Sequence, residues 1–207
     1  MPDLETTRLS LHTVAELVLA GPQFEQSRTI KLRVSPGGFA TVTTPQARVD
    51  GTSLVATGRT VPLDGRTVAD VAAEAGLGPR PLEDVYSGGC GLSRKHPLTV
   101  KEPAAAEIAE AFRRGEEAMA ALAPDAERVL WPEHLDLAIS LDEVNYGVSP
   151  GDSTIPVPYA YVGPWTPSAA TGPFWNAPFG AAHSLRELAD LLGFFAEGKA
   201  LTSAARR

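Results

Sequence analysis

The chain of 207 residues has one cysteine, no long apolar run and no excess of positive charge. The single cysteine, Cys90, cannot form an internal disulfide, which agrees with a reducing compartment. Apolar residues never continue for the roughly 18 positions that indicate a membrane-spanning helix. The acidic residues Asp3 and Glu5 stand where a signal peptide would be basic. We therefore expect a cytoplasmic protein with no membrane partner.

The motifs of several common chemistries are missing as well. The chain contains no G-x-x-x-x-G-K-[ST] phosphate loop, no C-x-x-C pair and no H-E-x-x-H zinc motif. Its net charge is −7, whereas nucleic acids and anionic membranes attract a field of Lys and Arg. These absences disfavour nucleotide chemistry, zinc-protease chemistry and nucleic-acid binding. The sequence leaves the oligomeric state open.

The acidic excess lies in the second half of the chain. Residues 103–207 contain 7 basic and 14 acidic side chains. From residue 129 to residue 185 there is no Lys or Arg, although this stretch contains eight of the 14 aromatic residues and several acidic ones. Such acidic side chains face water, pair with basic residues from elsewhere in the chain, or bind a cation from outside. The sequence leaves these three alternatives open.

Hydrophobic periodicity and turn residues predict an α+β fold, with a mainly antiparallel sheet and about four packed helices. We expect one compact domain over residues 1–207, with two halves, 1–102 and 103–207, as the alternative. Gly21-Pro22 is expected to end the first helix. The expected helices are 7–20, 67–75, 103–122 and 184–195, and the expected strands are 29–34, 39–43, 47–49, 54–57, 60–63, 134–141 and 157–163.

The segment 134–141 has the clearest strand pattern, because apolar and polar residues alternate along it. The apolar positions, which we expect to be buried, are Leu135, Leu137, Ile139 and Leu141. We expect this strand to pair antiparallel with 156–163 across the loop 142–155. That pairing places Asp136 opposite Tyr161, so that one face is aliphatic and the other polar and aromatic.

The polar and aromatic face is the predicted ligand site. Aromatic rings together with carboxylates can hold an organic cation by cation–π attraction and charge pairing. We expect a small cationic or amphipathic molecule, bound within residues 130–185. The candidate residues are His134, Asp136, Tyr159, Tyr161, Glu143, Asn145 and Trp165.

Three other interpretations of the same segment stay open. One is a divalent-metal-assisted enzyme of the hydrolase type, in which a bound ion activates water. Its metal ligands would be His134, Asp136 and one further carboxylate, from Glu133, Glu143 or Asp152. Another is a protein–protein interaction domain, since Trp and Tyr are enriched at interface hot spots. The last is a solvated polar sheet face with no ligand.

Other chemically active residues are expected to have structural roles. Cys90 lies in a Gly-rich segment, and His96 follows it closely, but we interpret this thiol as a loop or packing residue. His12 and Glu16 are four residues apart on the first predicted helix, which is the spacing of an ordinary side-chain pair.

Two segments resemble parts of conserved uncharacterised proteins of high-GC bacteria. They are WPEHLDLA at 131–138 and PYAY at 158–161. The likeness covers about residues 130–180 and implies no particular activity. The order of helix, strands, helices, strands and helix is also loosely similar to that of sterol-carrier-like domains, which implies an apolar ligand cavity.

Overall fold

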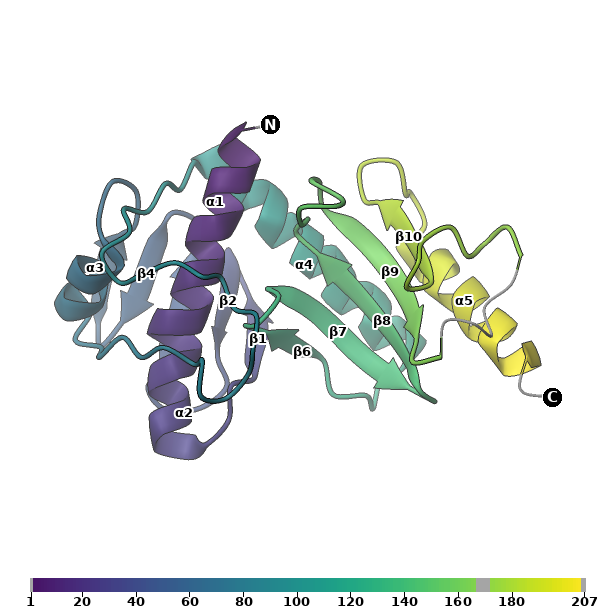
Figure 1. The fold of residues 1–207 in the computed structure, drawn as a ribbon, viewed down its shortest axis with the longest axis horizontal. Helices are drawn as coiled ribbons and strands as arrows, with labels where there is room; N and C mark the ends of the chain where they lie inside the picture. Colours follow the sequence, from purple (N-terminus) through teal and green to yellow (C-terminus); the bar gives the residue numbers. More distant parts are fainter. Residues whose placement is uncertain (1, 167–171, 206–207) are drawn as a thin grey trace. The chain divides into compact units, whose positions relative to one another are not determined.

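The computed structural model describes residues 2–166 and 172–205, and Figure 1 shows their course. The chain divides into two compact units. Both consist of helices and antiparallel strands, which confirms the predicted α+β class with a mainly antiparallel sheet. A single domain over the whole chain stays a prediction. Unit 1 is Met1–Glu110 with Val129–Asp136, and unit 2 is Ala111–Arg128 with Leu137–Arg207.

Unit 1 begins with one continuous helical segment whose middle is a π-helix. Its parts are α1 (Pro2–Thr13), the π-helix η1 (Val14–Ala20) and α2 (Gly21–Ser27). The predicted end at Gly21-Pro22 is therefore wrong. The N–H of Gly21 donates to the carbonyl of Glu16, five residues back, so Pro22 falls in the first turn of α2. Pro22 has no N–H to donate to the Leu17 carbonyl, five residues back, and this carbonyl accepts the Arg80 N–H at 2.9 Å instead.

An antiparallel sheet packs against this helical segment. Its strands are β1 (Leu32–Ser35), β2 (Gly38–Thr41), β3 (Ala47–Asp50), β4 (Ser53–Ala56), β5 (Arg59–Pro62) and β6 (Val129–Trp131). Their order in the sheet is β6-β1-β2-β3-β4-β5. Ser35 pairs with Gly38, and Asp50 pairs with Ser53, so tight turns join the strands expected at 29–34 and 39–43 and those expected at 47–49 and 54–57. The strand β6 was not predicted.

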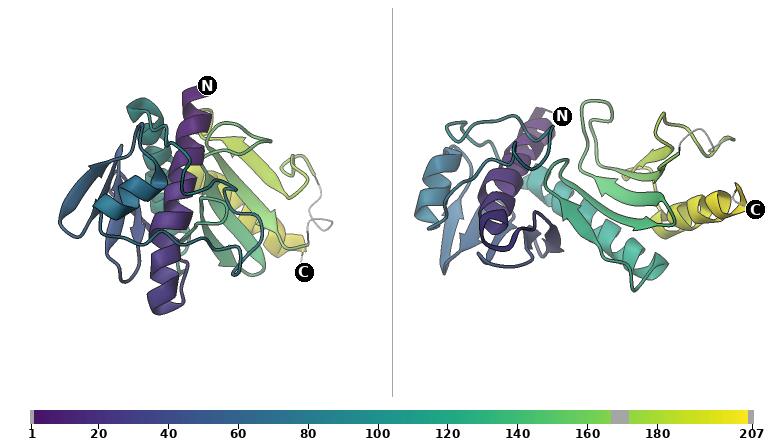
Figure 2. Two further views of the ribbon diagram at one scale, coloured as in Figure 1. Left: turned by 60° about the vertical axis from the view of Figure 1, so that its left-hand side comes forward. Right: turned by 60° about the horizontal axis from the view of Figure 1, so that its bottom comes forward.

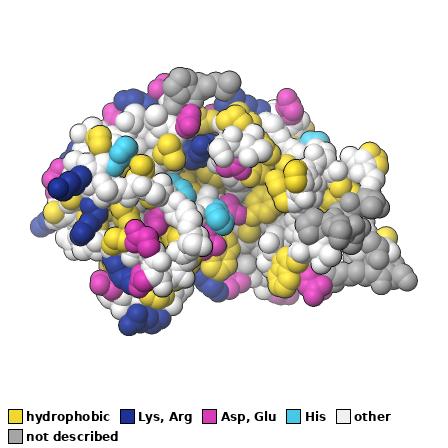
Figure 3. Space-filling model, in the orientation of Figure 1, with side chains coloured by type: hydrophobic (Ala, Val, Ile, Leu, Met, Phe, Trp, Pro, Cys, Tyr) yellow, Lys and Arg dark blue, Asp and Glu magenta, His cyan; other side chains and the backbone are white. Residues whose placement is uncertain are grey.

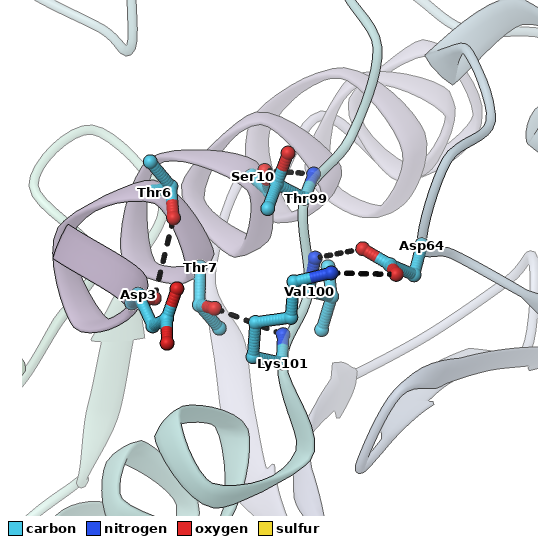
Figure 4. A network of polar contacts seen from close by, with 8 residues as sticks. All are labelled: Asp3, Thr6, Thr7, Ser10, Asp64, Thr99, Val100 and Lys101. Carbon is cyan, nitrogen blue, oxygen red and sulfur yellow. Dashed lines mark hydrogen bonds and ion pairs between the residues drawn. The ribbon is translucent and has the colours of Figure 1, made fainter.

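A long connection, residues 75–101, joins two helices and is fastened to α1. The two helices are α3 (Val68–Glu74) and α4 (Glu102–Leu122). Near the end of the connection, the N–H of Thr99 donates to Ser10 Oγ at 2.8 Å, and the N–H of Lys101 donates to Thr7 Oγ1 at 3.0 Å (Figure 4). Polar side chains of α1 thus hold an irregular segment whose strand-like pairing is an isolated antiparallel bridge between Thr67 and Pro97.

The Asp64 carboxylate holds the same segment. It accepts the Val100 N–H at 2.8 Å and the Lys101 ammonium at 2.9 Å (Figure 4). The Lys101 ammonium and then the Val100 N–H lower the pKa of Asp64, because both hydrogen bonds favour its ionised form.

Unit 2 is a sheet with helices on one face. Its strands are β7 (Asp136–Leu141), β8 (Val144–Ser149), β9 (Tyr159–Pro164) and β10 (Ala181–Ser184), and α4 is followed at the end of the chain by α5 (Leu191–Ala205). The strands run antiparallel in the order β7-β8-β9-β10. Figures 1 and 2 show α4 and α5 on the same face of these strands.

Aliphatic and aromatic side chains form the core between this sheet and its helices. Gly115 of α4 approaches β8 so closely that a methyl group there would lie 2.9 Å from Val148 Cγ2. Tyr146 of β8 meets Phe195 of α5 edge to face, with 6.0 Å between the ring centroids. The predicted burial of the alternating apolar residues is confirmed for Leu135, Leu137 and Ile139, whereas Leu141 is half-exposed.

The predicted pairing of 134–141 with 156–163 is wrong. The strand β8 lies between β7 and β9, so Leu137 pairs with Val148 rather than with a residue of β9. The chain reverses after β7 through Asp142-Glu143, which both have positive φ values, 48° and 57°. Two-residue turns of this kind usually contain Gly or Asn, so this Asp-Glu pair gave no turn signal in the sequence.

The last helix begins later than predicted. Ser184 ends β10 instead of capping a helix, and α5 begins at Leu191. Asp190 Oδ1 accepts the N–H of Gly193 at 2.8 Å, which is the capping bond of α5. The guanidinium of Arg114 donates to the carbonyl of Leu185 at 2.8 Å, and this bond stabilises a turn where a helix was expected.

Candidate functional site

The face of the unit 2 sheet opposite the helices is polar and aromatic, as the sequence predicts. Directly paired residues form rows across it: Ser140 with Asn145 and then Gly163, and Gly147 with Tyr161. Figure 3 shows hydrophobic side chains gathered among polar ones over β7, β8 and β9 on this face. This face consists of strands, which are more rigid than loops.

Trp165, directly after β9, is the most prominent side chain of this face because it is 62% exposed. Its indole Nε1 donates to Asn145 Oδ1 at 3.1 Å, and Ser140 Oγ donates to the same oxygen at 2.7 Å. Its backbone N–H donates to the carbonyl of Glu143 at 2.9 Å. The indole is thus held in place while one large aromatic surface stays open to solvent.

A turn with two acidic residues is joined to Trp165 through the backbone. Asp142 and Glu143, between β7 and β8, are both exposed. No Lys or Arg occurs in the sequence between residues 129 and 185, and Lys199 of α5 lines a small pocket together with Asp142. An aromatic surface and exposed carboxylates next to each other form an environment that attracts cations.

The two tyrosines of β9 share a face, as predicted, but they differ in role. The ring of Tyr161 lies across Gly147, where an added Cβ would be 2.2 Å from its Cζ. Tyr159 is buried, and its hydroxyl donates to Asp152 Oδ2 at 2.6 Å. Asp152 also accepts two backbone N–H groups through Oδ1. Tyr159 and Asp152 therefore stabilise the loop after β8.

The other predicted residues belong to unit 1. His134 lies in the turn before β7 instead of on a strand, and it is exposed. Its Nε2 is 3.8 Å from Glu133 Oε1. Asp136 is the first residue of β7. Within residues 2–166 and 172–205, no group of three or more His, Cys, Asp or Glu side chains is placed to hold a metal ion.

The sequence reasoning missed a G-x-S-x-G pattern at 147–151. In α/β-hydrolases this pattern places a nucleophilic serine on a turn between a strand and a helix. Here Ser149 is buried at the end of β8, and its Oγ accepts the N–H of Gly151 at 3.1 Å. A loop follows instead of a helix, so this serine has a structural role.

Cys90 also lacks the features of a nucleophile. Burial raises the pKa of its thiol to about 11, and the nearby Glu16 carboxylate acts in the same direction. The reactive form of cysteine is the thiolate, which such a pKa makes scarce at neutral pH. This agrees with the structural role expected from the sequence.

No protein-family model, no curated protein and no solved structure matches this chain. Its described helices are also too short or too polar to cross a membrane. The geometry of its own side chains is therefore the basis for assigning a function.

Proposed function

We propose that the protein is a binding protein for a small organic cation, held on the open sheet face of unit 2. The cation rests on the indole of Trp165, and the negative charge comes from Glu143, whose carbonyl accepts the Trp165 N–H. Asn145 is a positioning residue, since it holds the indole. The observation that carries this proposal is the exposed indole fixed by the Asn145 hydrogen bond.

The chemistry of the site favours a methylated or quaternary ammonium group. Such a group has its positive charge spread over an apolar surface, and it pairs with the face of an aromatic ring without needing hydrogen-bond acceptors. A cation–π contact at an exposed position contributes about 0.5–1 kcal/mol. Exposed carboxylates add about 0.2–1 kcal/mol each. The expected affinity for the headgroup alone is therefore low, and an apolar part of the ligand would raise it.

Titration of the full chain with tetramethylammonium, followed by calorimetry or by NMR shifts, tests the proposal. We expect Trp165→Leu to abolish binding, because leucine keeps an apolar side chain but has no π face. Trp165→Phe should bind more weakly than the wild type, because a cation is attracted less strongly by phenylalanine. Glu143→Gln should weaken binding more at low salt than at high salt, because salt screens the attraction between the glutamate and the cation.

Trp175→Leu is the matched control, because it removes a half-buried tryptophan of the same unit. It should leave the binding of tetramethylammonium unchanged. Equal binding by Trp165→Leu and the wild type would contradict the proposal. If the wild type binds no cation and Trp165→Leu sediments as a smaller assembly than the wild type, Trp165 belongs to a protein interface instead of a ligand site.

A further inference from the structure

A second cluster of polar side chains lies buried in unit 1, around the π-helix. Glu16 is only 4% exposed, and it is the only charged residue among the seven buried residues of η1. His12 precedes it by one turn, and Tyr86 and Cys90 come from the connection 75–101. Buried carboxylates are rare unless they are paired, so this position needs an explanation.

The π-helix itself is unusual at this position. The bond from the Gly21 N–H to the Glu16 carbonyl spans five residues, which widens the helix where Glu16 enters the interior. The carbonyl of Leu17 accepts the N–H of Arg80 at 2.9 Å, so the connection is bound to the same turn. Single π-helical turns occur frequently at functional sites.

The segment 86–91 covers the Glu16 carboxylate with its backbone. The N–H of Cys90 donates to Glu16 Oε2 at 2.7 Å. Gly89 lies so close that an added Cβ would be 2.2 Å from Glu16 Oε1. A ligand that replaces the Cys90 N–H as hydrogen-bond donor would therefore contact the Glu16 carboxylate.

Two further polar atoms of the cluster have no partner. His12 Nε2 and the Tyr86 hydroxyl are both buried without a hydrogen bond among the described residues. Unpaired buried polar atoms are uncommon in native proteins, because each costs about 1–3 kcal/mol. The Tyr86 hydroxyl lies beside the Glu16 carboxylate, and His12 lies near Glu16 and near the backbone of Pro132 and Glu133.

The cluster supplies no positive charge of its own. Burial lowers the pKa of His12, so its imidazole is mostly uncharged at pH 7. Burial, followed by the negative charge of Glu16, raises the pKa of Tyr86, which keeps its phenol neutral. In the part of the chain that the structure describes, Glu16 forms no ion pair, and the donors beside its carboxylate, the Cys90 N–H and the Tyr86 hydroxyl, are both neutral.

We propose that His12, Glu16 and Tyr86 form a second binding site, independent of Trp165, for a nitrogen cation that carries several N–H donors, such as a guanidinium or a primary ammonium. Glu16 pairs with the charge, while the His12 nitrogen and the Tyr86 oxygen accept further hydrogen bonds. A cation with several donors can serve all three acceptors at once. A quaternary ammonium cannot, because it has no N–H.

Calorimetric titration of the full chain with methylguanidinium, at constant ionic strength, tests this site. The wild type should bind methylguanidinium, and Glu16→Gln should weaken binding at least about tenfold, as expected for a hydrogen-bonded charge pair. Glu25→Gln is the matched control, because Glu25 is an exposed glutamate of α2. It should bind like the wild type.

The thermal midpoint of Glu16→Gln gives a second readout. We expect it to equal or exceed that of the unliganded wild type, because the amide keeps the Cys90 bond and removes a buried charge. A midpoint well below that of the wild type would assign Glu16 to folding and overturn the proposal.

Tyr86→Phe is an independent test of the site, because it leaves Glu16 in place. It removes one oxygen atom and should weaken methylguanidinium binding about twofold to tenfold, the equivalent of one hydrogen bond. The same affinity in Tyr86→Phe and the wild type would overturn the proposal. So would a wild type that binds tetramethylammonium at Trp165 but does not bind methylguanidinium.

Discussion

Asn145 is the residue that gives Trp165 a defined position. Its Oδ1 accepts both the indole N–H and the Ser140 hydroxyl, so it links the indole to the β7–β8 hairpin. Without this bond, the ligand would have to order the exposed indole, and the entropic cost would lower the binding affinity. A preformed platform therefore depends on a residue that the cation itself need not contact.

We expect Asn145→Ala to weaken tetramethylammonium binding although Trp165 is kept. Loss of one hydrogen bond corresponds to about 0.5–1.5 kcal/mol. The same variant should show faster depolarisation of its tryptophan fluorescence, since one of the indoles becomes mobile. Unchanged affinity in Asn145→Ala would show that the hydrogen bond does not position the indole for binding.

Cys90 is expected to react slowly with alkylating reagents. Burial raises the pKa of its thiol from 9.0 to about 11, so at pH 8 the thiolate fraction is about 100-fold lower than for an unperturbed thiol. The alkylation rate of the native chain with iodoacetamide, compared with that of the urea-unfolded chain, measures this difference. Similar rates in the two states would contradict the buried position of Cys90.

His12 makes the stability of unit 1 depend on pH. Its pKa in the folded state is lowered by burial from 6.5, so the unfolded chain binds the proton more readily. The free energy of unfolding should therefore be highest above pH 6.5 and should fall as the pH decreases below that value. In His12→Asn this decrease should be smaller. Urea unfolding of both proteins between pH 5 and pH 8 measures the difference, and identical pH profiles would be contrary to this account.

At the level of elements, β7 connects the sheet of unit 2 to its core. Leu137 is fully buried, and its Cδ2 would lie 3.2 Å from a Cβ at Gly115 of α4. Leu137→Ala should lower the free energy of unfolding by about 2–5 kcal/mol, because it leaves a cavity between the sheet and the helix. Denaturant unfolding measures this loss. A decrease well below 2 kcal/mol would show that the helix moves in to fill the space.

Helix and strand periodicity predicted most elements, because their burial pattern repeats along the chain. The elements that were missed depend on interactions between distant residues or on rare turns. The strand β8 was missed because Asp142-Glu143 adopts positive φ without Gly or Asn. The helix through Gly21-Pro22 was missed because a π-helix has no recognised sequence signal.

The candidate sites were predictable to different degrees. The acidic and aromatic composition of 129–185 indicated the segment that contains Trp165 and Glu143. The role of Asn145 depends on its register opposite Gly163, which the incorrect strand pairing did not give. Glu16 was expected to form an ordinary side-chain pair with His12, because a four-residue spacing does not indicate whether the pair is buried. A carboxylate among the apolar residues 14–20 was the available signal.

At the level of the whole molecule, the charge distribution agrees with cationic ligands. The net charge is −7, and all of this excess lies in residues 103–207. A negative field of this kind raises the local concentration of small cations and speeds their association at low salt. Each of the two proposed sites contains a carboxylate, Glu143 in unit 2 and the buried Glu16 in unit 1.

Calorimetric titration of the wild type, Trp165→Leu and Glu16→Gln with tetramethylammonium and with methylguanidinium tests these two sites most directly. We predict that Trp165→Leu loses the heat of tetramethylammonium binding and keeps that of methylguanidinium binding. Glu16→Gln should lose the heat of methylguanidinium binding and keep that of tetramethylammonium binding. Loss of both ligands in one variant, or no binding of either cation by the wild type, would contradict the account.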